Sequence, residues 1–112
     1  MADNLEVAGE SIRSSRVTGT AVYGADKEKI GSVEDLVIGK RDGQVRYAIL
    51  GVGGFLGMGE DHHTLPWNQL DYDTDLGGYR VTVTKEQLQS APTNARGTEP
   101  DYDRVDTYYS SL

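Results

Sequence analysis

Apolar and polar residues alternate in short runs along most of this chain, and glycine-containing turns separate the runs. Alternation with a period of two is typical of strands that bury one face. The pattern predicts strands at residues 16–23, 30–38, 44–52, 62–67, 70–73 and 79–83. Short strands joined by tight turns favour an all-β fold. We expect a small antiparallel β-barrel of five to six strands, with a short helix after the last strand and a tail.

A bulge and a hairpin are predicted near the middle of these runs. The apolar positions of the second predicted strand change parity between Val33 and Leu36, which predicts a β-bulge or a strong bend. The triplet Arg41-Asp-Gly43 lies between two apolar runs and predicts a tight hairpin. Strands that coil sharply to close a small barrel favour residues without a Cβ atom, and glycine occurs within the predicted strands at Gly19, Gly31 and Gly51.

The period changes after residue 83. Thr84 and Gln87 match a capping box, in which two side chains satisfy the free N–H groups at the start of a helix. The pattern predicts a short helix that runs through Leu88 and ends before Pro92.

Residues 91–112 form an acidic tail that contains several tyrosines, and the sequence supports two interpretations of it. Prolines break regular structure and the acids repel one another, which favours disorder. Three residues are nevertheless spaced as on one face of a helix: Tyr102, Val105 and Tyr109. Tyr108 lies beside them, and Pro100 suits the first helical position. Because so short a helix is marginal in water, it would form only by docking. The tail is either disordered or a docked short helix.

Bulky apolar residues interrupt a glycine-rich segment at residues 53–59. Loops are usually polar because their backbone groups need water, yet here glycine alternates with Phe55, Leu56 and Met58. Exposed apolar side chains of this kind mark interaction sites. We interpret as candidate protein-binding residues Phe55, Leu56, Met58, Tyr102, Tyr108 and Tyr109. We expect structural roles in the loop and at the barrel rim for Gly53, Gly54, Gly57, Gly59, Pro66 and Trp67.

Length and charge narrow the classes of function. The 112 residues are expected to hold a flexible segment at 1–13, one barrel domain at 14–90 and the tail at 91–112. The net charge is −7, and the bases are scattered among acids, which argues against nucleic acid as a partner. The start of the chain lacks the pattern of a signal peptide, and no stretch is long enough to cross a bilayer. We therefore expect a cytoplasmic protein without membrane insertion.

The residue patterns that suggest chemistry are incomplete. The chain has no cysteine, which excludes disulfides and thiolate chemistry. His62 and His63 are neighbours on a predicted strand, so their imidazoles point to opposite faces and cannot chelate one ion. Residues 71–75 begin like a calcium loop but lack its glycine and its bidentate glutamate. The glycines match no phosphate-binding fingerprint, and the serines match no nucleophile elbow. We expect no catalytic residue, no metal site and no cofactor.

Five segments, in order over residues 14–90, resemble the PRC-barrel domain family. They are Val17-Thr-Gly-Thr-Ala-Val-Tyr-Gly24, Lys29-Ile-Gly-Ser-Val-Glu-Asp-Leu36, Val45-Arg-Tyr-Ala-Ile-Leu50, Gly53-Gly-Phe-Leu-Gly-Met-Gly59 and Leu65-Pro-Trp67. The family takes its name from the cytoplasmic domain of the photosynthetic reaction-centre H subunit. It also includes a domain of a ribosome maturation factor and small stand-alone bacterial proteins. The resemblance implies a barrel that acts as a protein-binding adaptor without catalysis of its own.

We expect a non-enzymatic interaction or adaptor module that binds a protein partner and self-associates through the apolar loop, most simply as a homodimer. Peripheral association with a membrane complex is compatible with this function. An alternative is a sensor of a small ligand, an ion or pH, with a pocket near His63 and Trp67, since these residues share a strand face. A third hypothesis, which rests on the maturation-factor relative, is a ribosome-assembly factor.

Overall fold

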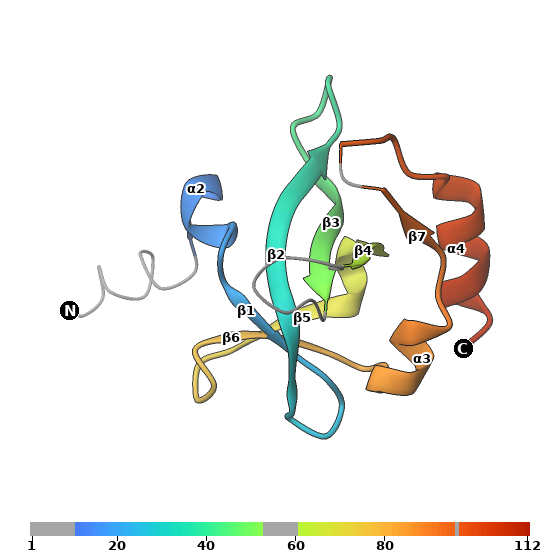
Figure 1. Ribbon diagram of the computed structural model, residues 1–112. Helices are drawn as coiled ribbons and strands as arrows, with labels where there is room; N and C mark the ends of the chain where they lie inside the picture. The colour runs from blue at the N-terminus through green and yellow to red at the C-terminus, as the bar shows by residue number, and fades with distance from the viewer. Residues whose placement is uncertain (1–10, 53–60, 96) are drawn as a thin grey trace.

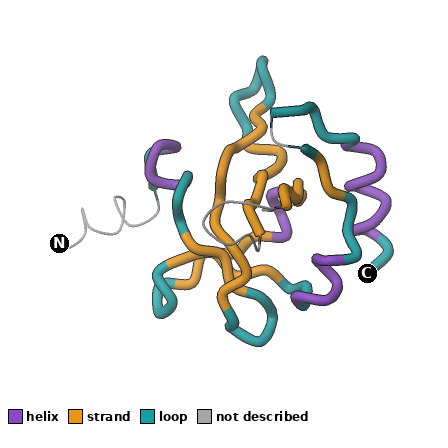
Figure 2. The backbone as a smooth tube through the Cα atoms, in the orientation of Figure 1, coloured by secondary structure: helices purple, strands orange, loops and turns teal. Residues whose placement is uncertain are grey.

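The computed structural model describes residues 11–52, 61–95 and 97–112 of the chain (Figure 1). Its elements follow the order α2 (Ser14–Val17), β1 (Ala21–Tyr23), β2 (Lys29–Ile38), β3 (Val45–Val52), β4 (Asp61–Pro66), the 3-10 helix η1 (Trp67–Gln69), β5 (Leu70–Asp73), β6 (Gly78–Val81), α3 (Lys85–Gln89), β7 (Thr93–Asn94) and α4 (Tyr102–Ser110). The strands form one sheet in the order β5-β6-β1-β2-β3-β4-β7. Figure 2 shows this sheet curving around a single interior.

The structure confirms the barrel-like, mainly β fold class with a short helix after the last long strand. The described sheet has seven strands, where five to six were expected. The additional strand is β7, whose two residues carry no pattern long enough to be recognised in the sequence. The pairing is antiparallel, with the exception that β1 and β6 run parallel.

The first predicted strand is wrong over its N-terminal half, because α2 occupies Ser14–Val17 and β1 begins at Ala21. Two threonine side chains favour the helical turn. The hydroxyl of Thr18 donates to the carbonyl of Ser15 at 3.1 Å, and that of Thr20 donates to the carbonyl of Arg16 at 2.7 Å. Gly19 then takes a φ of +88°, in the left-handed region that glycine favours, so this glycine serves a turn and lies outside the strand.

The bulge and the hairpin predicted for β2 and β3 are both present. The register shifts between Val33 and Asp35, so that Val33 and Leu36 both reach the core although their parity differs. At the hairpin Gly43 has a φ of +70°, and the carboxylate of Asp42 accepts a hydrogen bond from the Gln44 N–H at 3.0 Å. The local sequence therefore determines both the bend of β2 and its return into β3.

Gly31 allows β2 to approach β3 closely. A Cβ atom placed on Gly31 would lie 2.1 Å from the carbonyl oxygen of Gly51, a separation that real Cβ atoms do not show. The two glycines predicted to permit sharp coiling thus lie against each other where the strands cross.

The capping box after β6 is confirmed at atomic detail. The Gln87 N–H donates to the Thr84 hydroxyl at 3.1 Å, and the Gln87 side-chain oxygen accepts from the Thr84 N–H at 2.9 Å. The resulting helix α3 buries Leu88 completely. Upstream, β4 ends at Pro66, one residue earlier than predicted, because proline has no N–H for the ladder.

The core fills the interior of the curved sheet and extends to the C-terminal helix. Leu50, Leu65 and Leu88 are fully buried at its centre. Trp67 and Leu70 pack against it from its margin, and Trp67 meets the ring of Tyr79 at 5.5 Å in an edge-on contact. Trp67 is therefore a partly buried aromatic side chain at the margin of the core.

Candidate interaction groove

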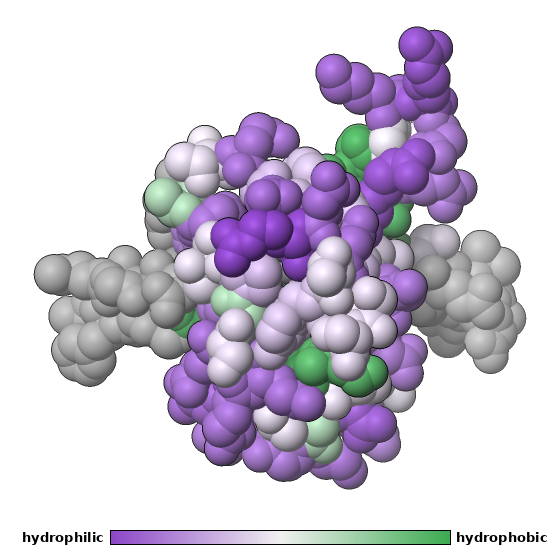
Figure 3. Space-filling view, turned by 90° about the vertical axis from the view of Figure 1, so that its right-hand side faces the viewer, coloured by the Kyte–Doolittle hydropathy of each residue, from purple (hydrophilic) through white to green (hydrophobic). Residues whose placement is uncertain are grey.

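The C-terminal arm, defined as residues 91–112, packs against the outer face of the sheet (Figure 1). β7 extends the sheet beside β4, with Asn94 opposite His62. α4 lies against β4 and buries Val105 and Tyr109, which are 2% and 5% exposed. The apolar stripe predicted from the sequence lies on the face that α4 buries. Of the two alternatives for the tail, the structure shows the docked short helix. Figure 3 shows that the face presented by α3 and α4 is mainly hydrophilic, as expected when the apolar stripe points inward.

α4 begins at Tyr102, two residues later than Pro100, the predicted first helical position. Asp101 is the N-cap, and its carboxylate accepts a hydrogen bond from the Arg104 N–H at 3.2 Å. Pro100 precedes this cap and is buried, so it packs the approach to the helix and is not its first helical residue.

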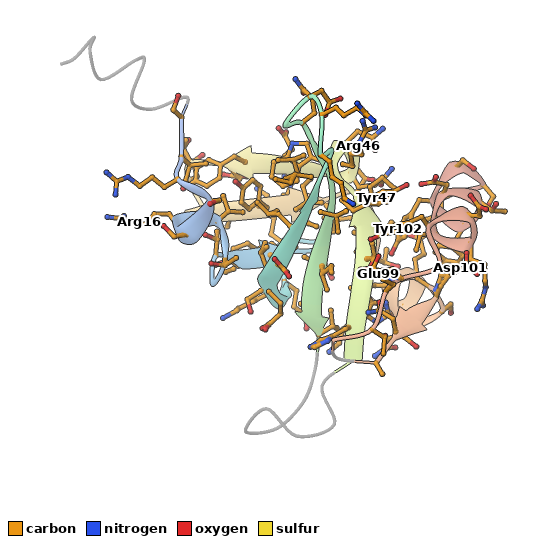
Figure 4. All side chains as sticks on the ribbon, turned by 90° about the horizontal axis from the view of Figure 1, so that it is seen from above. Arg16, Arg46, Tyr47, Glu99, Asp101 and Tyr102 are labelled. Carbon is orange, nitrogen blue, oxygen red and sulfur yellow. The ribbon has the colours of Figure 1, made fainter. Side chains whose placement is uncertain are left out.

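Tyr47 of β3 anchors the arm from the sheet side. Its hydroxyl donates to the carboxylate of Asp106, with distances of 2.9 and 3.0 Å to the two oxygens. The rings of Tyr47 and Tyr102 lie 4.7 Å apart, and Figure 4 shows both side chains in the space between β3 and α4. Burial, together with the hydrogen bond and charge of Asp106, raises the pKa of Tyr47 to about 12. The neutral phenol is thus the form that holds α4.

We expect Tyr47→Phe to weaken docking of the arm by about 1 kcal/mol, the usual net value of one hydrogen bond. Since the folded pKa lies above the usual value of about 10, this contribution is complete below pH 10 and is lost as the pH rises through about 12. Urea unfolding of both proteins at neutral pH and at about pH 11 measures the difference. A gap between wild type and variant that does not shrink at alkaline pH would contradict this role.

Between the arm and the outer face of the sheet lies a groove of about 530 Å³, which we call the arm groove. Its floor is apolar, with Leu36, Val37 and Ile38 of β2 beside Ile49 of β3. Carboxylates stand on both walls: Glu34 and Asp35 on β2, and Glu99 on the arm. The described lining residues are Glu34, Asp35, Leu36, Val37, Ile38, Lys40, Ile49, His62, Asn94, Gly97, Thr98, Glu99, Pro100 and Tyr102.

The rim of the arm groove is acidic and its floor includes an exposed aliphatic side chain. Among the described lining residues three are carboxylates, and the basic side chains are those of Lys40 and the buried His62. Ile38 is 56% exposed. The hydroxyl of Tyr102 donates to Glu99 at 3.2 Å, which holds this carboxylate at the arm side of the groove (Figure 4). The groove therefore offers apolar contact together with attraction for cations.

Both histidines of β4 are buried, at 6% exposure for His62 and 1% for His63. The sequence placed the two imidazoles on opposite faces of a strand, and did not predict that both faces would be covered. The docked arm covers the outer face, so β4 is enclosed on both sides.

The structure separates the residues that the sequence grouped as protein-binding. Phe55, Leu56 and Met58 lie outside the described residues, as do Gly53, Gly54, Gly57 and Gly59. Tyr102 lines the arm groove, whereas the Tyr108 hydroxyl donates to the carbonyl of Gln87 on α3. Tyr109 is only 5% exposed and belongs to the core. Its side chain therefore packs α4 onto the barrel and is not available to a partner protein.

The sequence interpretation missed the groove residues of β2. Ile38 was treated as one more strand residue, although its exposure makes it part of the candidate surface. Its position at the end of the strand, next to the polar hairpin, was the available signal. The acidic pair Glu34 and Asp35 at the bulge was the other.

The sequence of the chain matches the PRC-barrel domain over residues 9–88. The matched region includes β1 to β6 and most of α3. The chain belongs to the PRC-barrel family. The resemblance seen in its glycine-rich motifs is thereby confirmed.

One relative of this PRC-barrel protein is an uncharacterised protein of Deinococcus radiodurans. The two are 32% identical over 71 residues, which cover 63% of this chain and 25% of the relative. The chain thus corresponds to about a quarter of that protein.

The arm lies beyond the residues that match the PRC-barrel domain. The arm groove therefore combines a wall from the family domain with a wall from this C-terminal extension. In the described ranges, no cluster of three or more His, Asp or Glu side chains is placed to hold a metal ion. None of the helices in the described parts is long and apolar enough to cross a membrane.

Proposed function

We propose that this protein is a non-catalytic interaction module whose arm groove binds a partner-protein segment that combines basic and apolar side chains. The observation that carries the proposal is the arm groove itself, with its aliphatic floor and carboxylates on both walls. PRC-barrel domains are generally non-catalytic, which agrees with this type of work.

The chemistry of the groove favours a peptide segment. A volume of about 530 Å³ lies in the range of ligand sites. Apolar contact with Leu36 and Ile38 would supply affinity, since burial of apolar surface is the main favourable term in association. The carboxylates of Glu34 and Glu99 would select cationic side chains and speed their approach, while each exposed ion pair adds little affinity by itself.

The test is selection from a displayed library of short peptides, followed by nuclear magnetic resonance titration of the labelled protein. We expect the bound peptides to be enriched in Lys or Arg next to apolar residues, and the amide shifts to cluster at the arm groove. Ile38→Asp should weaken their binding about tenfold or more, because it places a charge on the apolar floor.

Leu112→Asp is the matched control, because Leu112 is 55% exposed against 56% for Ile38 and does not line the groove. It should bind the selected peptides like wild type. Peptides that shift residues elsewhere, or that bind Ile38→Asp unchanged, would show that the arm groove is not the binding surface.

Four finer hypotheses accompany this proposal. Homodimerisation through the loop of Phe55, Leu56 and Met58 stays a prediction, because these residues lie outside the described part. A ribosome-assembly role and a cytoplasmic location likewise stay predictions. For the sensor alternative, His63 is 1% exposed, so a ligand at the surface of Trp67 would not touch its imidazole.

A further inference from the structure

A basic and apolar surface lies at the beginning of the described chain. We call Ile12, Arg13 and Arg16 the basic patch. Ile12 is 48% exposed and both arginines are exposed, and residues 11–25 contain no acid. Figure 4 shows the Arg16 side chain directed outward from α2, away from the sheet. Within the described residues neither arginine forms an ion pair, since the ion pair found there joins Arg46 and Asp42.

The basic patch is complementary to the arm groove in charge and in apolar character. The groove displays carboxylates around an aliphatic floor, and the patch displays guanidinium groups around an aliphatic side chain. Four large apolar side chains of the described residues are clearly exposed, and two of them are Ile12 of the patch and Ile38 of the groove. Arginine suits such a contact because its guanidinium binds carboxylates through two parallel hydrogen bonds.

The two surfaces are neighbours on the fold. A cleft of about 270 Å³ separates α2 from the end of β2, and its lining includes Ser14 and Ser15 of α2 with Asp35 and Ile38 of β2. Because Arg16 points away from β2, its guanidinium is directed away from the groove of its own chain and is accessible to a second molecule. When two complementary surfaces lie side by side on one chain, a two-fold axis can satisfy both contacts at once.

We infer that the arm groove of one copy binds the basic patch of a second copy, so that the protein self-associates through paired contacts of Ile12, Arg13 and Arg16 with Ile38 and the groove carboxylates. This inference rests on the proposed function and names its partner. The net charge of −7 opposes association at long range, but charges beyond about 8 Å are screened at physiological salt, so the local complementarity decides.

The experiment is a charge reversal with mixing, followed by light scattering and analytical ultracentrifugation. One variant carries Arg13→Glu and Arg16→Glu, and the other carries Glu34→Lys and Asp35→Lys. Each alone should associate at least about tenfold more weakly than wild type, because like charges then face each other across the contact. An equimolar mixture should form the mixed dimer, since each reversed surface meets an opposite one. A chain with all four substitutions should dimerise like wild type.

The mixture also controls for folding, because a variant that is merely misfolded would not regain association when mixed. A wild-type protein that stays monomeric at all concentrations overturns the inference. So does a dimer that survives both reversals. If such a dimer is lost in Leu56→Asp with Met58→Asp, the apolar loop is the contact instead.

The proposed function can be judged separately with a synthetic peptide of residues 11–19. This peptide should shift the amides of the groove, and its Arg13→Glu, Arg16→Glu counterpart should not. If this peptide does not bind while peptides from the library still occupy the groove, the self-association inference is wrong and the proposed interaction function is retained. If neither binds, both proposals fall.

Discussion

Replacing Gly31 by alanine is expected to lower the free energy of unfolding by about 3 kcal/mol, the upper range for overpacking in a tight site. The new Cβ atom would lie 2.1 Å from the Gly51 carbonyl oxygen and 3.3 Å from the Cα of Val52. Both neighbours are backbone atoms of β3, so relief requires the paired strands to separate. Urea unfolding followed by circular dichroism measures the loss.

Gly24→Ala is the matched control for this prediction. A Cβ atom on Gly24 would meet its nearest neighbours at 3.4 to 3.6 Å, which is ordinary van der Waals contact. Its unfolding free energy should change by less than about 1 kcal/mol. Equal stability of the two variants would show that β2 and β3 can move apart at little cost and that the close approach is not essential.

Val105→Asp is expected to release α4 from the barrel. Val105 is 2% exposed, and a carboxylate there would lose water without gaining a partner, so undocking becomes the cheaper state. Burial of an apolar side chain contributes about 1.5 to 3 kcal/mol, and the release also exposes Tyr109. We expect amide hydrogen exchange in α4 to rise towards that of a free peptide, while the central strands keep their protection.

Thr107→Asp provides the control, because Thr107 is an exposed residue of the same helix and carries the same new charge. Its exchange should resemble that of wild type. The released arm also removes the wall of Glu99 and Tyr102, so Val105→Asp should lose binding to peptides selected on the arm groove. Unchanged exchange in α4, or intact peptide binding after its release, would contradict the arrangement described above.

These two variants distinguish the barrel from the arm. The Gly31 contact belongs to the part of the chain that matches the PRC-barrel domain, and Val105 belongs to the extension beyond it. The arm groove needs both parts, because β2 and β3 form its floor and residues 97–100 form its opposite wall. Binding at the arm groove therefore requires both the PRC-barrel domain and the C-terminal arm.

Much of the fold was predictable from local sequence rules. The bulge between Val33 and Leu36 was visible as a change of parity, and the hairpin was visible in Arg41-Asp-Gly43. The capping box of Thr84 and Gln87 follows from side-chain reach within a few residues. Such features depend on contacts between residues close in sequence, so they can be predicted without knowledge of the tertiary structure.

Two features of the fold were not predicted by the alternating pattern. The alternating pattern of residues 16–20 suited a strand, yet the bonds from the hydroxyls of Thr18 and Thr20 stabilise a turn of helix instead. The other is the burial of His62 by the arm, which no pattern in β4 predicts. In both cases an interaction outside the periodic pattern outweighed a preference of the strand that is worth about 1 kcal/mol or less.

The sequence by itself determined the family, the strand order along the chain, the sharp bends and the helix caps, because these follow from backbone geometry and near-neighbour chemistry. Only the tertiary structure decided that α4 docks, since an isolated helix of this length is marginal and needs packing against β4 to form. That docking buries His62 and allows the Tyr47 hydroxyl to donate a hydrogen bond to Asp106. It also supplies one wall of the arm groove. The candidate site therefore joins residues about sixty positions apart, such as Ile38 and Glu99, which no local pattern connects.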